Sequence, residues 1–240
     1  MKQIIKALIA QTPYRIVRDR GANRFQAIDV SLRDMKDRGF FPRVVIDGGA
    51  HLGSFSLATK QIFPCATFHL VEPQPACRVP LKALCAKEGF ILHECALADH
   101  VGKIGLSRTT EPSTGAHIVP NSDTETSIVS ASTLDALLGQ RISVHDRALL
   151  KLDLQGYELH ALRGGPTLLH SIEVILTEVS FFAQAYEPTI ADLIKFLDIS
   201  GFQLYDIVAL TGRARDNRAH QGDFVFARKN SQLLEDARWE

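Results

Sequence analysis

Residues 44–53 read Val-Val-Ile-Asp-Gly-Gly-Ala-His-Leu-Gly, an apolar run that ends in an acid and a glycine-rich turn. A second apolar run, 67–71, ends in Glu72. A strand, a glycine-rich turn, a helix and a second strand tipped by a carboxylate are typical of a nucleotide-binding βαβ unit. Glycines allow a tight turn and leave room for a ligand beside the backbone, and Glu72 can accept two hydrogen bonds from a ribose diol.

The details of this turn favour S-adenosylmethionine over NAD. The dinucleotide fingerprint is G-x-G-x-x-G, and an alignment on Gly48 and Gly53 puts Ala50 at the middle position, where a Cβ obstructs a pyrophosphate. Asp47 precedes the first glycine and would repel a phosphate. S-adenosylmethionine carries an ammonium and a sulfonium and no phosphate, so we expect Asp47 to lie near this cationic ligand. An NAD-linked oxidoreductase on the same fold is the alternative.

Length and composition predict one soluble α/β domain. The chain has 240 residues, of which 45% are hydrophobic, enough for a substantial core. Its 27 basic and 27 acidic residues balance, which argues against a nucleic-acid partner, although a local basic patch at Arg213, Arg215 and Arg218 stays open. No stretch is long enough to anchor the chain stably in a membrane. The four cysteines form no C-x-x-C pair, which is typical of buried thiols in a reducing cytoplasm.

Hydrophobic runs alternate with helical patterns, which predicts a mostly parallel sheet with helices on both faces. The expected strands are 43–47, 67–71, 90–95, 148–153, 173–178, 202–209 and 223–227. The last should be antiparallel, in a C-terminal hairpin. We predict a helical cap at 1–40, one catalytic domain at 41–230 and a tail at 231–240, with a homodimer left open. The polar segment 108–125 predicts a long substrate-side loop.

Carboxylates end four of the predicted strands: Asp47, Glu72, Asp153 and Glu178. Ligands of such sheets bind beyond the carboxyl ends of the strands, and carboxylates gathered there are costly unless something pairs with them. We assign the first two to the cofactor and the last two to a substrate, a cation or a metal. As structural alternatives, Asp153 would cap the following helix and Glu178 would bind amides of the next loop.

With these residues in view, the chain resembles the FkbM family of S-adenosylmethionine-dependent O-methyltransferases from about 43 to 227. The motif blocks occur in the family's order: I-D-x-G-A-N-x-G-x-x-S at 46–56, F-P-x-A at 63–66, E-P at 72–73, A-L-x-D at 96–99, T-L-D at 133–135, L-L-K-x-D-x-x-G-x-E at 149–158, E-V-S at 178–180 and D-x-x-F at 223–226. The main departure is His51, where the family usually has Asn.

The resemblance implies a Rossmann-like class I methyltransferase fold and methyl transfer to a hydroxyl of a sugar, a glycan or a natural product. We expect the cofactor to be bound by Asp47, Gly48, Gly49, His51, Gly53, Ser56, Glu72, Ala96 and Leu97. Asp153 and Glu178 are the expected catalytic residues, acting as a base or as ligands of a divalent metal ion; the two alternatives stay open. An RNA-directed methyltransferase is a further alternative, against which the neutral charge argues.

Overall fold

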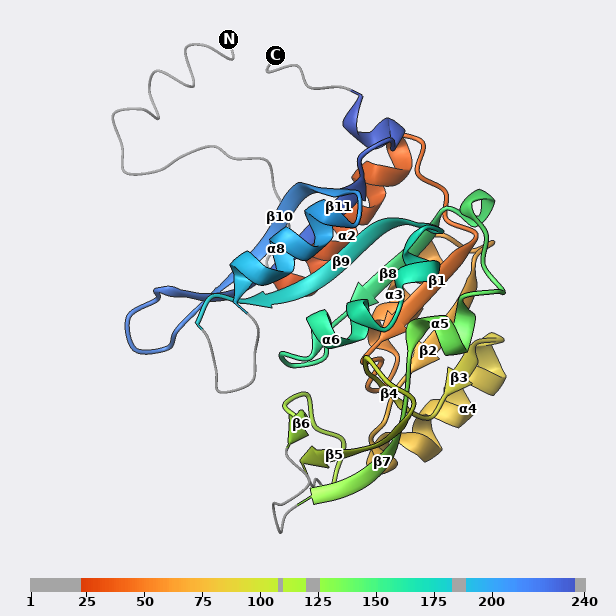
Figure 1. The fold of residues 1–240 in the computed structure, drawn as a ribbon, viewed down its shortest axis with the longest axis vertical. Helices are drawn as coiled ribbons and strands as arrows, with labels where there is room; N and C mark the ends of the chain where they lie inside the picture. The colour runs from red at the N-terminus through yellow and green to blue at the C-terminus, as the bar shows by residue number, and fades with distance from the viewer. Residues whose placement is uncertain (1–22, 108–109, 120–125, 183–188, 236–240) are drawn as a thin grey trace.

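The computed structural model describes residues 23–107, 110–119, 126–182 and 189–235. Its centre is a seven-stranded sheet in the order β10-β11-β9-β8-β1-β2-β3 (Figure 1). The strands are β1 Val44–Gly48, β2 Thr67–Val71, β3 Ile91–His93, β8 Ala148–Leu152, β9 Ile172–Ser180, β10 Phe202–Gly212 and β11 Ala219–Arg228. The predicted sheet is therefore confirmed, with seven strands close to their expected positions.

The topology places a crevice at the middle of this sheet. Strand β1 pairs in parallel with β2 on one side and with β8 on the other, and β8 pairs in parallel with β9. Strand β11 inserts antiparallel between β9 and β10, which confirms the C-terminal hairpin. The chain winds in opposite directions from β1 and β8, and ligands bind at the carboxyl ends of the strands at such a point.

Helices cover both faces of the sheet because alternate residues of each strand face opposite sides (Figure 1). Val45 and Leu149 pack towards α2 (Arg24–Asp37), α3 (Ser54–Ile62) and α4 (Arg78–Glu88). Their neighbours Ile46 and Leu150 pack towards the other layer, which consists of α5 (Leu134–Leu138), α6 (Glu158–Arg163), α7 (Pro166–Leu169) and α8 (Ile190–Ile199). Both faces are buried, so the central strands are mostly apolar.

A second, smaller sheet was not predicted. It has the order β4-β7-β5-β6 and lies in the lower part of Figure 1. Its strands are β4 Ala96–Leu97, β5 Gly102–Ser107, β6 Ile118–Val119 and β7 Thr126–Ser132. The prediction of an unbroken loop over 108–125 is wrong for β6; 108–109 and 120–125 lie outside the described residues. Strands β4 and β6 have two residues each and β7 is rich in serine, so their pattern could not be told from a loop.

The two ends of the described chain pack against the core. Residues 1–22 of the predicted cap lie outside the described part, and α2 begins after Asn23, whose Oδ1 accepts from the amide of Gln26 at 3.1 Å. In the predicted tail, residues 232–234 form a 3-10 turn that buries Leu233. In the part of the chain that the structure describes, no helix combines the length and apolarity needed to cross a bilayer.

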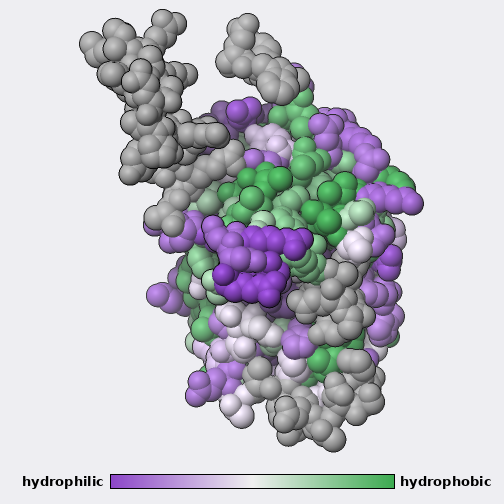
Figure 2. All heavy atoms as spheres, turned by 90° about the vertical axis from the view of Figure 1, so that its left-hand side faces the viewer, coloured by the Kyte–Doolittle hydropathy of each residue, from purple (hydrophilic) through white to green (hydrophobic). Residues whose placement is uncertain are grey.

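The edge strand β10 carries exposed apolar side chains, and a hydrophilic area lies beside hydrophobic surface on this side of the molecule (Figure 2). The turn between β10 and β11 holds the arginines of the predicted basic patch. Arg213 is paired with Asp216, and the guanidinium groups of Arg213 and Arg218 lie 5.2 and 4.4 Å from the ring centre of Phe182. This patch is therefore partly neutralised and partly packed on an aromatic ring.

Candidate active site

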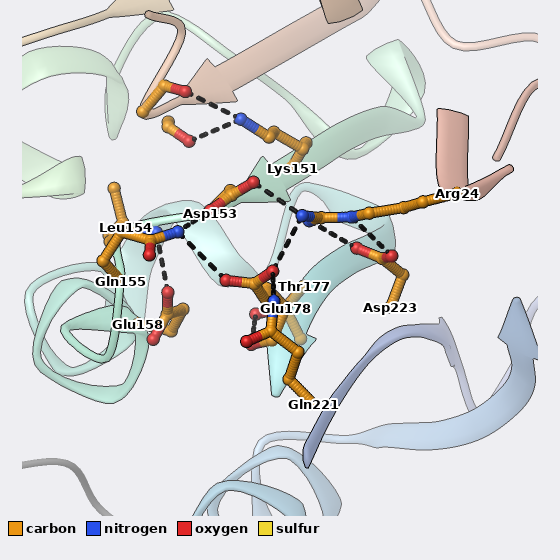
Figure 3. A network of polar contacts seen from close by, with 12 residues as sticks. Arg24, Lys151, Asp153, Leu154, Gln155, Glu158, Thr177, Glu178, Gln221 and Asp223 are labelled. Carbon is orange, nitrogen blue, oxygen red and sulfur yellow. Dashed lines mark hydrogen bonds and ion pairs between the residues drawn. The ribbon is translucent and has the colours of Figure 1, made fainter. Parts of the chain in front are cut away.

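Three carboxylates meet at the edge of the sheet where β8 and β9 end and the antiparallel β11 begins, around the guanidinium of Arg24 from α2 (Figure 3). Arg24 binds Asp223 through Nε and Nη2, both at 2.7 Å. Its Nη2 also lies 3.0 Å from Asp153, and its Nη1 lies 2.8 Å from Glu178. The structure thus brings Asp153 and Glu178 together, as expected for residues of one site, and adds Asp223 and Arg24.

Two glutamines connect these carboxylates. The side-chain Nε2 of Gln155 donates to Asp153 at 2.7 Å and to Glu178 at 3.1 Å. The side-chain Nε2 of Gln221 donates to Glu178 at 2.6 Å. Gln155 adopts a left-handed backbone conformation with φ of 54°, which costs a non-glycine residue roughly 1–2 kcal/mol. Backbone strain of this kind tends to occur at functional sites.

Buried Glu158 supports this strained turn. Its Oε1 accepts from the amides of Leu154 at 2.6 Å and Gly156 at 3.3 Å. Burial raises the pKa of Glu158 to about 7. Glu158 therefore shapes the loop that carries Asp153, and it does not line the larger cavity described below.

Burial and nearby charges shift the pKa values of Glu178 and Asp153 in opposite directions. Burial raises the pKa of Glu178 to about 8, and the negative charge of Asp153 adds to the effect. Burial alone would also raise the pKa of Asp153, but the positive charges of Lys151 and Arg24 outweigh it and lower that pKa. A carboxylate whose pKa lies near neutrality beside one that stays ionised is the combination expected of an acid–base pair.

The structure gives Asp47, an expected cofactor residue, partners within the protein. Its side chain is fully buried and binds Lys151 Nζ at 2.9 Å and Ser56 Oγ at 2.7 Å. Lys151 Nζ also donates to the carbonyls of Gly48 and Gly49, at 3.1 and 2.8 Å. Neither Asp47 nor Ser56 is among the residues that line the two cavities described below. Ser56 binds Asp47, Asp47 binds Lys151, and Lys151 holds the glycine-rich turn.

The glycines of this turn are required mainly by protein packing. A Cβ on Gly49, whose φ is +72°, would lie 2.1 Å from the carbonyl oxygen of Asp153. A Cβ on Gly53, whose φ is +80°, would lie 2.4 Å from a methyl of Leu84. Gly48 is similarly crowded by Leu152, at 2.8 Å. Of the three predicted cofactor glycines, only Gly49 lines the cleft.

Glu72 and His51 both line the first of the two cavities described below. Glu72 is 5% exposed, and its two oxygens accept from the amides of His51 at 2.7 Å and Gln74 at 2.9 Å. Burial raises the pKa of Glu72, although these two hydrogen bonds oppose the effect. The side-chain Nε2 of His51 is buried and has no hydrogen-bond partner among the described residues. An orphaned buried donor or acceptor in a cleft is the feature expected where a polar ligand binds.

Two adjoining cavities connect these groups. The first, of about 650 Å³, is lined by Glu72, Ala96, Leu97 and Tyr157, among others. The second, of about 1300 Å³, is lined by Phe25 and Phe55 and by Arg24 with the three carboxylates and two glutamines around it, which together form the Arg24 cluster. They share Gly49, His51, Thr114, Asp153 and Gln155, so one ligand can reach from the first into the second. The residues present fit a nucleoside on the first side, with a carboxylate for the ribose and apolar walls for the base.

The small sheet encloses the first cavity. The side-chain amide of Gln74 donates to the carbonyl of Ser113 at 3.0 Å, and its oxygen accepts from the amide of Ser113, also at 3.0 Å. This pair holds the segment before β6 against the turn after β2. Ser113, Thr114 and His117 from this segment line the cavity.

Asp153 and Glu178, the candidate metal ligands, lie beside an arginine side chain. Within the described ranges, no group of three or more His, Cys, Asp and Glu side chains is arranged to hold a metal ion. Asp153 and Glu178 are instead bound to the guanidinium of Arg24.

Sequence reasoning missed four residues of the cluster, and two of them had a usable signal. Asp223 lies in the D-x-x-F block and is paired in register with Glu178 on the neighbouring strand. Gln221 precedes it by two residues and so lies on the same face of β11. Gln155 lies at a variable position of the L-L-K-x-D-x-x-G-x-E block, which assigns it no role. For Arg24 there was no signal, because only the packing of α2 brings it to the site.

Comparisons with known proteins agree with this geometry. The family model described as the methyltransferase FkbM domain matches residues 47–204. An FkbM methyltransferase from Methylobacillus flagellatus KT is 16% identical with a TM-score of 0.48; the match covers 76% of this chain but only 43% of that protein. An rRNA methylase from Streptococcus thermophilus is 9% identical with a TM-score of 0.50, over 89% of this chain and 99% of that one. A search of curated proteins finds no significant match.

These identities show the fold alone, whereas the family model carries the assignment. The structural likeness confirms the class I methyltransferase architecture that the strand order already indicates. The family match spans β1 to the start of β10, and it includes the glycine-rich turn, Glu72, Asp153 and Glu178. Because this match covers well over half of the 240 residues, the chain belongs to the FkbM family of S-adenosylmethionine-dependent methyltransferases.

Proposed function

We propose that the protein transfers a methyl group from S-adenosylmethionine to a hydroxyl of a sugar, a glycan or a natural-product acceptor. The observation that carries the proposal is the second cavity. Its walls combine carboxylates, side-chain amides and two phenylalanines, Phe25 and Phe55, and it opens into the nucleoside side of the cleft. Polyhydroxylated ligands are bound by such groups, because carboxylates and amides accept and donate to hydroxyls while aromatic rings pack on apolar faces.

On the cofactor side, we assign Glu72 to the ribose hydroxyls and Ala96 and Leu97 to the base. Each oxygen of Glu72 accepts one backbone hydrogen bond and keeps acceptor capacity for a diol. The unpartnered Nε2 of His51 is available to a polar group of the methionine part. When bound, the cofactor supplies a methyl group that its sulfonium has already activated.

On the acceptor side, Glu178 is the proposed base and Asp153 the group that orients the hydroxyl. A sugar hydroxyl is a weak acid, so a carboxylate within reach that can take up its proton assists the transfer. Asp153 stays ionised beside Lys151 and Arg24 and can accept a hydrogen bond without taking the proton. Gln155 and Gln221 restrict the rotation of both carboxylates, which favours one acceptor orientation.

The family assignment argues against the NAD-linked alternative. RNA remains an outcome of the test, because the balanced charge argues against it only indirectly. We further propose a reducing, cytoplasmic setting, which accords with the free state of Cys65, Cys77, Cys85 and Cys95.

Calorimetry with S-adenosylhomocysteine tests the cofactor, and we expect a dissociation constant on the order of micromolar. Saturable NAD binding without a response to S-adenosylhomocysteine would overturn the assignment. Methyl-labelled S-adenosylmethionine should then be offered to panels of oligosaccharides, hydroxylated natural products and tRNA. NMR of the labelled product distinguishes a methyl ether from an N-methyl group, and labelling of tRNA alone would reject the proposed acceptor class.

With an acceptor identified, Glu178→Gln and Asp153→Asn should keep S-adenosylhomocysteine binding and lose turnover by roughly 100-fold or more. Asp198→Asn is the matched control, because this exposed carboxylate lies away from the cleft and pairs with the surface Lys229. Turnover near that of the control in both site variants would reject the assigned roles.

A further inference from the structure

Arg24 occupies a position that helix physics alone disfavours. It is the first residue of α2, directly after the N-cap Asn23. The amino end of a helix carries partial positive charge, so a cation there is unfavourable. The next turns of α2 bury Ala27, Ile28 and Leu32 against the sheet, which fixes the helix and points its first turn at the cluster. The ion pairs, rather than helix stability, account for an arginine at this position.

The carboxylates are arranged around this single cation. Asp153, Glu178 and Asp223 come from three different strands, and each has an oxygen within 3.0 Å of a guanidinium nitrogen. Lys151, the other nearby cation, is held by Asp47 at 2.9 Å. Without Arg24, three acidic side chains would converge with no opposite charge between them. Oxygen-rich sets of this kind are the ligands that hard divalent cations prefer.

We propose that Arg24 is a positioning residue: its guanidinium is the built-in counter-cation of the acceptor site and supplies to Asp153, Glu178 and Asp223 the positive charge that a divalent ion would otherwise supply. The N–H groups of a planar guanidinium point in fixed directions and so fix the orientation of each carboxylate. A spherical ion imposes less directional constraint on its ligands. Arg24 lies before the segment 47–204 that the family model matches and belongs to none of the motif blocks quoted above, so the family match gives this side chain no role.

The inference rests on the proposed function only in taking this cluster as the acceptor site. It predicts that removing the guanidinium converts the cluster into a cation site. The probe is Mn²⁺ alone, counted as free ion by electron paramagnetic resonance. Arg24→Ala should bind one Mn²⁺ at least about ten-fold more tightly than the unchanged protein, and Asp223→Asn in the same chain should abolish this binding.

Two controls isolate the guanidinium. Arg33→Ala removes an exposed arginine from the same helix and should leave Mn²⁺ binding as weak as in the unchanged protein. Arg24→Lys keeps a cation in place and should also stay free of Mn²⁺. Should Arg24→Ala not fold alone, Mn²⁺ or Mg²⁺ added during refolding should restore it, since the ion replaces the lost charge.

The outcomes are separable from those of the proposed function. S-adenosylhomocysteine should bind Arg24→Ala within about three-fold of the unchanged protein, because the carboxylates that Arg24 binds among the described residues lie on the acceptor side. Loss of that ligand in the unchanged protein would count against the methyltransferase reading. Equal Mn²⁺ affinity with and without Arg24, or no rescue of an unfolded Arg24→Ala by either ion, would overturn the role of Arg24.

Discussion

Lys151→Met tests how the glycine-rich turn is held. The ammonium of Lys151 is buried, binds the fully buried Asp47 at 2.9 Å and donates to two carbonyls of the turn. Burial alone would lower the pKa of Lys151, but the charges of Asp47 and Asp153 outweigh it and raise the pKa. Methionine keeps the length of the side chain and removes the charge. Asp47 is then left in the core with Ser56 as its remaining hydrogen-bond partner.

Removing one partner of a buried ion pair costs about 3–5 kcal/mol, because the other charge stays buried without compensation. For a domain of this size, that loss lowers Tm by roughly 6–20 °C. Removing the second charge as well should recover at least half of it. The double variant Asp47→Asn/Lys151→Met keeps a polar side chain beside Ser56 and buries no net charge.

The assay is urea unfolding followed by circular dichroism, with the free energy obtained by linear extrapolation. Lys229→Met, which breaks an exposed pair with Asp198, is the control and should change stability by less than about 1 kcal/mol. A Lys151→Met protein as stable as this control, with an unchanged m-value, would refute the reasoning. So would a double variant no more stable than the single one.

The same proteins distinguish two roles of Asp47. If Asp47 acts through Lys151 and the turn, a folded double variant should regain part of its affinity for S-adenosylhomocysteine along with its stability. If the carboxylate contacts the cofactor directly, stability returns and affinity does not.

Three further predictions concern the cleft and the loop that carries Asp153. Glu72→Ala should weaken S-adenosylhomocysteine binding by roughly 1.5–3 kcal/mol in calorimetry, since charge-assisted hydrogen bonds to the ribose are lost; unchanged affinity in a folded variant would make Glu72 purely structural. The pKa of Glu158 is raised from 4.5 to about 7, so the stability that its protonated form contributes is fully present below pH 4.5 and is lost as pH rises through 7. Glu158→Gln should therefore gain up to about 3 kcal/mol relative to the unchanged protein between pH 4.5 and 8, and a pH-independent difference would contradict this. Gln74→Ala should speed the release of S-adenosylhomocysteine in stopped-flow measurements, because the two 3.0 Å hydrogen bonds to Ser113 hold the segment that covers the first cavity; an unchanged rate would show that this segment does not limit release.

Much of the fold was predictable because strand burial is written in local patterns. The strands β1, β2, β8 and β9 are largely apolar, since helices bury both faces of each strand. The small sheet was not predictable. Strands β4 and β6 have only two residues each, β7 is interrupted by serines, and β4 pairs with β7 across more than 30 residues of chain. No local periodicity reports such pairing.

The site was predictable where chemistry coincides with strand ends. Glu72, Asp153 and Glu178 each follow or end a core strand, and parallel strands bring their carboxyl ends to one edge, so the sequence alone indicated that these groups meet. It indicated less well what each would touch. Asp47 fits a cationic ligand by its position, yet tertiary packing gives it a lysine two residues before Asp153, because β8 lies directly beside β1.

The sequence by itself determined the fold class, the family and the edge of the sheet at which chemistry occurs, since these follow from periodicity and from motifs within single βα units. Only the tertiary structure decided the charge balance of the acceptor site. Arg24 and Asp223 are separated by 199 residues, and no local pattern relates them. They meet because α2 packs across the sheet and β11 inserts beside β9, and a guanidinium among three carboxylates exists only once both have happened.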